Sequence, residues 1–324
     1  YISIGQIKIN GAINSTSTGK INFVARTSYA SNNLTTCTSG ACASIYNSSS
    51  ASITTKGGYV VMDATGGTLS GTTITIGSVQ NGPIYLNAGI NTTTAGGSSS
   101  GVGGNFSLAG SANLASGIGS FEPNVAPLNI GGNANFSLKN YSSASYGFVV
   151  ASYLTTSPIT AYGDIDITSV GASTSGNGLI YLTSALTSTA GNITLTATST
   201  NTNSTGNPGV SGTSTGTLTA NAGTITINSD SNASTAVSLP GAISAKSILI
   251  TGTSTTASTI VSLGAMTIVA GGSDLSVTAN NSSGGSNTGI TQTGAIANNA
   301  SGGSISFTSN NTISQNGAIT LAAN

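Results

Sequence analysis

The sequence predicts an all-β protein built as a parallel β-solenoid, and three observations support this prediction. Apolar residues, 37% of the chain, recur two apart in short segments, which is the period of a strand rather than of a helix. These segments are rich in Ile, Val and Thr, the residues that favour strands, and the 45 glycines punctuate them. The segments also return at a near-regular interval, as expected of a coiled repeat.

A five-residue signature carries the prediction. It consists of a Gly, a second residue, and two apolar residues that flank a polar one, so both apolar side chains face the same side of a strand. It occurs at Gly5–Ile9, Gly19–Phe23, Gly82–Leu86, Gly104–Leu108, Gly163–Ile167, Gly191–Leu195, Gly223–Ile227, Gly303–Phe307 and Gly317–Leu321.

The interval between strong signatures sets the size of one coil. Their first apolar residues are at positions 84, 106, 136, 165, 193, 225, 248, 275 and 305, about 28 residues apart on average. Weaker copies of the signature lie between the strong ones, as at Ile180, which follows Ile165, and this indicates two or three strands per turn. We therefore expect roughly 11 to 16 coils. The alternative is an antiparallel β-sandwich of two domains. Its hairpin turns could form at Asn10-Gly11, Asn81-Gly82 and Asn316-Gly317.

Loop excursions are expected where the interval is irregular. Four stretches rich in Gly, Ser, Thr and Asn interrupt the beat, near residues 30–57, 92–104, 110–127 and 197–216. None of them has the charge of a linker tail. We expect residues 1–324 to form one solenoid rather than separate domains.

Charge excludes several classes of function. The chain has 6 basic and 6 acidic residues, a net charge of +0 and no His. This composition offers no electrostatic footprint for nucleic acid, and no apolar run is long enough for membrane insertion. Catalysis and metal binding draw on the residue types that are scarce here, so we expect no enzyme activity, no metal and no cofactor.

Weak candidate sites remain to be tested against the structure. Asp164 and Asp166 form a close carboxylate pair that could serve a polysaccharide lyase or hydrolase, although a solvated strand face is the simpler interpretation. Thr-x-Thr units such as Thr194/Thr196 and Thr224/Thr226 could order water in an ice-like lattice. We expect that lattice to be interrupted by Lys8, Tyr85, Asp164, Asp166 and Tyr181.

The only two cysteines are Cys37 and Cys42, within Thr-Cys-Thr-Ser-Gly-Ala-Cys. Without His they cannot complete an ordinary zinc site, so a disulfide that pins a loop is the expected arrangement. A disulfide would place the protein in an oxidising compartment.

The later repeats resemble a known family. Gly191–Ala197, Gly223–Asn228, Gly289–Ile296 and Ile313–Leu321 are similar to repeats of filamentous-haemagglutinin-type bacterial surface proteins. The resemblance covers mainly residues 160–324. It implies a right-handed parallel β-helix that is exported from a bacterium to its surface or surroundings, where it serves adhesion or matrix building. The Asn-Pro-Asn-Leu-type motif of that family's secretion domain is absent, so the secretion route does not carry over.

The ends of the predicted solenoid suggest its function. Strand pattern runs through Ile2, Ile4, Ile7 and Ile9 at one end and through Ile313, Ile319 and Leu321 at the other, and no polar cap is evident. An open strand edge recruits another chain, and a head-to-tail contact that does not close generates a fibre. We expect a polymer of identical subunits that supports adhesion or a biofilm matrix. The alternatives are a longer rod or a monomeric adhesin that binds surface glycans.

Overall fold

The computed structural model describes the chain as a stack of short parallel strands. The residues it describes are 2–3, 7–25, 45–64, 84–86, 88–93, 103–112, 121–123, 127–140, 148–150, 158–171, 178–199, 208–231, 235–255, 259–282 and 288–322.

Three columns of strands run along the molecule, and each coil contributes one strand to each column. Column 1 contains β1 (Ile2–Ser3), β4 (Ile21–Ala25), β7 (Val60–Ala64), β10 (Phe106–Ala112), β13 (Ala134–Asn140), β16 (Ile165–Gly171), β19 (Ile193–Ser199), the second halves of β21 (Leu218–Ser231) and β23 (Ile243–Ser254), β26 (Leu275–Asn281) and β29 (Ile305–Ser309).

Column 2 is the 11-stranded sheet of β2 (Ile7–Ile9), β5 (Ile45–Asn47), β8 (Ile84–Leu86), β11 (Phe121–Pro123), β14 (Phe148–Val150), β17 (Ile180–Leu182), β20 (Val210–Gly212), β22 (Val237–Leu239), β24 (Thr259–Leu263), β27 (Thr288–Gln292) and β30 (Thr312–Gln315). Column 3 contains β3 (Ile13–Ser15), β6 (Ile53–Thr55), β9 (Ile90–Asn91), β12 (Leu128–Ile130), β15 (Ile159–Ala161), β18 (Leu186–Ser188), the first halves of β21 and β23, β25 (Met266–Ile268), β28 (Ile296–Asn298) and β31 (Ile319–Leu321).

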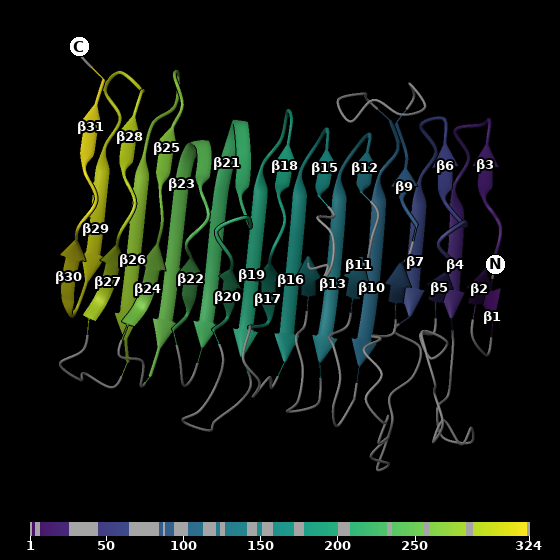
Figure 1. The fold of residues 1–324 in the computed structure, drawn as a ribbon, viewed down its shortest axis with the longest axis horizontal. Helices are drawn as coiled ribbons and strands as arrows, with labels where there is room; N and C mark the ends of the chain where they lie inside the picture. The colour runs from purple at the N-terminus through teal and green to yellow at the C-terminus, as the bar shows by residue number, and fades with distance from the viewer. Residues whose placement is uncertain are drawn as a thin grey trace.

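Every pairing between these strands is parallel, which confirms the β-solenoid and excludes the antiparallel sandwich for the described residues. Each coil passes from column 1 to column 2 to column 3, so there are three strands per turn. Figure 1 shows column 1 strands such as β10, β13 and β16 as long arrows that point down, and strands of the other two columns, such as β12, β15 and β18, as arrows that point up. The coils lie side by side along the long axis, with β1 to β3 at one end and β29 to β31 at the other.

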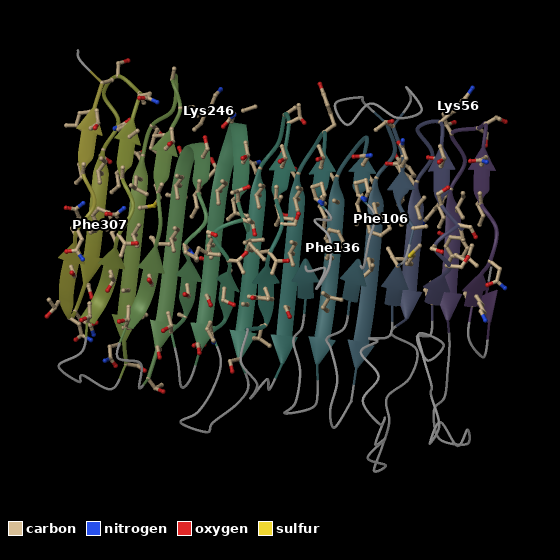
Figure 2. The ribbon with its side chains drawn as sticks, in the orientation of Figure 1. Lys56, Phe106, Phe136, Lys246 and Phe307 are labelled. Carbon is tan, nitrogen blue, oxygen red and sulfur yellow. The ribbon has the colours of Figure 1, made fainter. Side chains whose placement is uncertain are left out.

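The core consists of inward-facing side chains stacked in register. The first inward position of column 1 is occupied in successive coils by Ile165, Ile193, Ile225 and Ile248, all of them 0% exposed. Aromatic residues contribute to the interior in the preceding coils, where the rings of Phe106 and Phe136 meet edge to face with centroids 5.6 Å apart (Figure 2). Stacking like residues fills a narrow interior without charge, because a buried charge would lose its hydration.

Glycine is needed where column 3 turns into column 1. The Gly163 N–H donates to the Gly132 carbonyl at 3.0 Å, so consecutive corners stack backbone on backbone. A Cβ added at Gly191 would lie 2.6 Å from the backbone nitrogen of Asp164, closer than real atoms approach. Gly163, Gly191 and Gly223, which open the signatures of β16, β19 and the second half of β21, therefore let one corner lie directly on the next.

The predicted coil interval mixed two columns. Ile84 lies in β8 of column 2, whereas the later marker positions lie in column 1. Phe136 is the second inward residue of β13, and Ala134 is the residue in register with Phe106 and Ile165. Alternation alone identifies a strand but cannot tell which of three similar strands it is.

Strands occupy part of the stretches expected to be loops. β5 and β6 lie within 30–57, β11 lies within 110–127 and β20 lies within 197–216. These strands are only three residues long, so their signal is weak against the surrounding Ser and Gly. The connections from β4 to β5, β10 to β11 and β19 to β20 run from column 1 to column 2, whereas the stretch 92–104 belongs to the connection from β9 to β10, which runs from column 3 to column 1.

Candidate functional site

The last described coil leaves the interior of the solenoid uncovered. Ile313, Ile319 and Leu321 are 40%, 46% and 64% exposed. Their register partners one coil earlier include Ile290 and Ile296, which are both 0% exposed. Ile313, Ile319 and Leu321 continue columns of side chains from the preceding coil, and among the described residues no further coil covers them.

The backbone edge of this coil is also open within the described residues. β29, β30 and β31 pair with β26, β27 and β28 on one side and with no described strand on the other. Such a row of N–H and C=O groups is a template for adding another strand. Apolar side chains and an unpaired edge together make this end the best candidate site for assembly.

A buried glutamine pair leads to the same end. Gln292 is 0% exposed, and its Nε2 donates to the carbonyls of Gly264, at 3.2 Å, and Gly294. Gln315 lies in register with it and donates from Nε2 to the Oε1 of Gln292 at 3.1 Å. Among the described residues nothing donates to the Oε1 of Gln315, so the end coil also presents a hydrogen-bond acceptor.

The other end is arranged differently. Ile7 and Ile9 in β2 are 9% and 6% exposed and belong to the core, while Ile13 in β3 is partly buried against it. Ile2 belongs to β1, and Ile4 lies outside the described residues. β1 pairs only with the second half of β4, so Ile21–Phe23 has a described strand partner, β7, on one side alone.

The two carboxylates of the predicted pair have different surroundings in this structure. Asp164 stands in a ladder of side chains at the corner before column 1. Its backbone N–H donates to Asn133 Oδ1 at 3.0 Å, and its own Oδ1 accepts from the backbone N–H and Nδ2 of Asn192 at 2.7 and 3.1 Å. Asp166 follows on the outward face of β16, in register with Asn135 and Thr194. The carboxylate of Asp164 thus joins consecutive coils.

The amide ladder continues on both sides of Asp164. Asn105 Oδ1 accepts from the backbone N–H of Asn133 at 2.9 Å, and Asn192 Oδ1 accepts from that of Thr224 at 2.8 Å. Each rung satisfies a corner N–H of the next coil. Sequence reasoning missed this ladder, although its signal is visible as a polar residue between the opening Gly and the first apolar residue.

Asp274 occupies the equivalent position near the last coil. Its Oδ1 accepts from the Oγ and backbone N–H of Ser304 at 2.7 and 3.2 Å. These hydrogen bonds to Ser304, the side-chain one first, lower the pKa of Asp274 below its ordinary value of 3.8. Asp274 therefore connects the last coil to the one before it while it is ionised.

The Thr-rich surface is less interrupted than its sequence suggests. Lys8, Tyr85 and Tyr181 lie in column 2, so they are not on the outward face of column 1. From β19 to β29 that face presents Thr194, Thr196, Thr198, Thr226, Asn228, Asp230, Leu249, Thr251, Thr253, Ser276, Thr278, Asn280, Ser306 and Thr308 in register. Only Asp230 and Leu249 depart from Thr, Ser or Asn.

The remaining predicted features bear on other parts of the chain. Cys37 and Cys42 lie outside the described residues. Within the described ranges, no three His, Cys, Asp or Glu residues come together as metal ligands. The described part of the chain has no helix long and apolar enough to cross a membrane.

Comparison with known proteins does not extend the assignment. No family model, no curated protein and no solved structure matches the chain. The geometry of the solenoid and its surfaces is therefore the basis for inferring a function.

Proposed function

We propose that this chain is a structural protein of a bacterial surface or extracellular matrix that stacks end to end into filaments. The observation that carries the proposal is the exposure of Ile313, Ile319 and Leu321, at positions where Ile290 and Ile296 of the preceding coil are fully buried. The work is mechanical, and adhesion or matrix support follows from the length of the fibre. Enzyme chemistry has no part in it.

The contact would repeat the packing within the chain. If the columns are continuous across the joint, Ile313 meets Ile7 of the next copy and Ile319 meets Ile13. Burying the three half-exposed side chains contributes about 1 kcal/mol each, and the added backbone ladder contributes further. The two faces differ, so the contact is heterologous and continues into a filament instead of closing.

Two contacts of such a joint do not match in polarity. In the same alignment Gln315 faces Ile9 and Leu321 faces Ser15. An amide oxygen left against an apolar side chain loses its hydration without a partner. We therefore expect a joint that is weaker than the contact between coils of one chain, and assembly that depends on protein concentration.

Low charge favours this assembly. With 6 basic and 6 acidic residues in 324, stacked copies repel one another little. Few ion pairs are present to be screened, so filament formation should change little with salt concentration.

The test compares two substitutions one residue apart in β31. Ile319→Lys places a charge on the end of a core column, whereas Thr320→Lys, also exposed, places it on the outer face. Electron microscopy and sedimentation should show filaments for the unmodified protein and for Thr320→Lys, and short rods for Ile319→Lys. Discrete rods in every field of the unmodified protein would remove the proposal and leave the monomeric adhesin.

A second candidate function is binding to ice, and the outward face of column 1 from β19 to β29, which only Asp230 and Leu249 interrupt, favours it. Its Thr, Ser and Asn side chains repeat about every 4.8 Å along the axis and about every 6.6 Å along each strand. Thr is restricted at χ1, so the hydroxyls are held in fixed positions. A lattice of this kind, in which Asp230 is the one charged residue among those named, matches a periodic surface such as ordered water.

Ice growth tests this second candidate. The protein should slow ice recrystallisation, and Thr251→Lys at the centre of the array should abolish the effect. Ser262→Lys, on the outward face of column 2, is the control and should retain it. Ice growth that is unaffected by the unmodified protein would remove the candidate.

A further inference from the structure

Two Asn-Gly sequences occupy the same corner of the first and last described coils. Asn10-Gly11 follows β2 and precedes β3, and Asn316-Gly317 follows β30 and precedes β31. Both therefore lie where column 2 turns into column 3. Asn-Gly is chemically labile when the Gly nitrogen can reach the Asn side chain, because Gly has no Cβ to obstruct the approach.

The surroundings of the two sites differ. Asn10 and Gly11 are exposed, and a Cβ added at Gly11 would meet nothing within 4 Å. Among the described residues no hydrogen bond holds the Asn10 side chain or the Gly11 N–H. Ser48 of the next coil contacts the backbone here, through its N–H to the Ile9 carbonyl at 2.9 Å and through its Oγ to the Asn10 carbonyl at 3.4 Å, and both contacts leave the Asn10 side chain and the Gly11 N–H unbound.

Asn316 is held more firmly. Its backbone N–H donates to the Gln292 carbonyl at 2.8 Å, and its Nδ2 donates to Ser314 Oγ at 3.3 Å. Gly317 is packed so closely on Gly294 that an added Cβ would overlap the Gly294 carbonyl. The backbone rotation that brings a Gly nitrogen to the Asn side chain is opposed here by the coil beneath.

We propose that Asn10 is a self-modifying site, at which the chain converts its own asparagine to aspartate or isoaspartate and so weakens end-to-end stacking. The Gly11 nitrogen attacks Cγ of Asn10, forming the N–Cγ bond. The Cγ–Nδ2 bond breaks, and ammonia leaves with the proton of the Gly11 amide. Water then opens the cyclic imide at either carbonyl, which leaves a carboxylate.

The effect on assembly rests on the proposed function, whereas the chemistry does not. In a stack with continuous columns, Asn10 of one copy lies against Asn316 of the next. A new carboxylate there must be buried or left unpaired at the joint, and isoaspartate also adds a backbone atom to the corner. Modification would therefore limit the growth of a filament with age.

Peptide mass mapping of protein held at mildly alkaline pH tests the chemistry. Asn10 should convert about tenfold faster than Asn316, the factor that one hydrogen bond of ordinary net strength supplies. Unfolding in urea should make the two rates equal. Gly11→Ala, whose methyl group enters open space, should slow conversion at residue 10 alone. Conversion of Asn316 as fast as Asn10 in the folded protein, or a difference that persists in urea, would overturn the site.

Filament assays of Asn10→Asp test the consequence. This variant should assemble at a higher protein concentration than the unmodified protein, while Asn14→Asp, exposed on the outward face of β3, should not. Equal assembly of all three proteins would overturn the effect on stacking. If the unmodified protein forms no filaments, the proposed assembly fails, and the conversion rates alone decide whether Asn10 is a self-modifying site.

Discussion

Gln315 donates from Nε2 to the Oε1 of Gln292, 3.1 Å away, and so extends a buried amide ladder to the end coil. Gln292 has no exposure to solvent, and its own Nε2 faces the carbonyls of Gly264 and Gly294. The amide is needed here because a carboxylate could donate to neither carbonyl. The hydrogen bond between Gln315 and Gln292 thus joins the last two described coils.

Gln292→Glu should lower the free energy of unfolding by roughly 3 kcal/mol, because it buries a charge against carbonyl oxygens. The matched control is Thr291→Glu, which places the charge on the outward face of the same strand. Urea denaturation at neutral pH measures both variants. Equal midpoints for the two would contradict the buried ladder.

Ser169 and Ser229 occupy the same inward position of column 1, with Ala197 between them. Ser229 Oγ donates to the Ala236 carbonyl at 2.6 Å, whereas the buried Ser169 Oγ has no partner among the described residues. Ser169→Ala should therefore raise the free energy of unfolding by about 1 kcal/mol, and Ser229→Ala should lower it by about 1 kcal/mol. Thermal unfolding of the two variants decides this, and shifts of the same sign would show that the assignment is wrong.

Asp164 acts as a ladder residue, which predicts different results for two replacements. Asp164→Asn retains the oxygen that accepts from Asn192 and should leave the free energy of unfolding within about 0.5 kcal/mol of the unmodified protein. Asp164→Ala removes that acceptor and should cost about 1 kcal/mol. Denaturant titration measures both. If Asp164→Asn is the more damaging change, the negative charge matters and the ladder interpretation fails.

Asp274 should make the last coil sensitive to acid. Its pKa is lowered in the folded protein, so its contribution to stability is complete above the ordinary value of 3.8 and is lost as pH falls through the lowered pKa. Asp274→Asn removes this titration. Melting temperatures of the unmodified protein and of Asp274→Asn should differ at neutral pH and converge in acid, once the pH falls below the lowered pKa of Asp274. Ser304→Ala should reduce the difference, and a constant difference across the titration would contradict the assignment.

Strand identity and orientation of side chains could be predicted from the sequence. In Gly191–Leu195 the alternation places Ile193 and Leu195 inward, and both are 0% exposed. Register could not be predicted in the same way. The spacing of apolar residues predicts Phe136 as the start of a coil, but Ala134 holds that place, because both are apolar residues of the same strand and face the same side.

The candidate sites show the same division. Uncapped strand pattern at Ile313, Ile319 and Leu321 was visible in the sequence, and these residues are exposed at the last described coil. The role of Asp164 was not visible, because its partners Asn133 and Asn192 are 31 and 28 residues away. Proximity along the chain associated it with Asp166 instead.

The sequence by itself determined that this protein consists of short strands in a near-regular repeat, because a Gly corner, two apolar residues two apart and the near absence of charge suit stacked coils. It predicted a parallel solenoid and left an antiparallel sandwich open, which the parallel pairing of the strands excludes for the described residues. Only the tertiary structure decided which strands share a face. Lys8, Tyr85 and Tyr181 lie in column 2, away from the Thr-rich face of column 1, and Asp164 lies in an amide ladder, because strand pairing between coils sets the face and the neighbours of each residue. The loops give successive coils different lengths, so spacing along the chain does not reveal which residues the backbone register brings together.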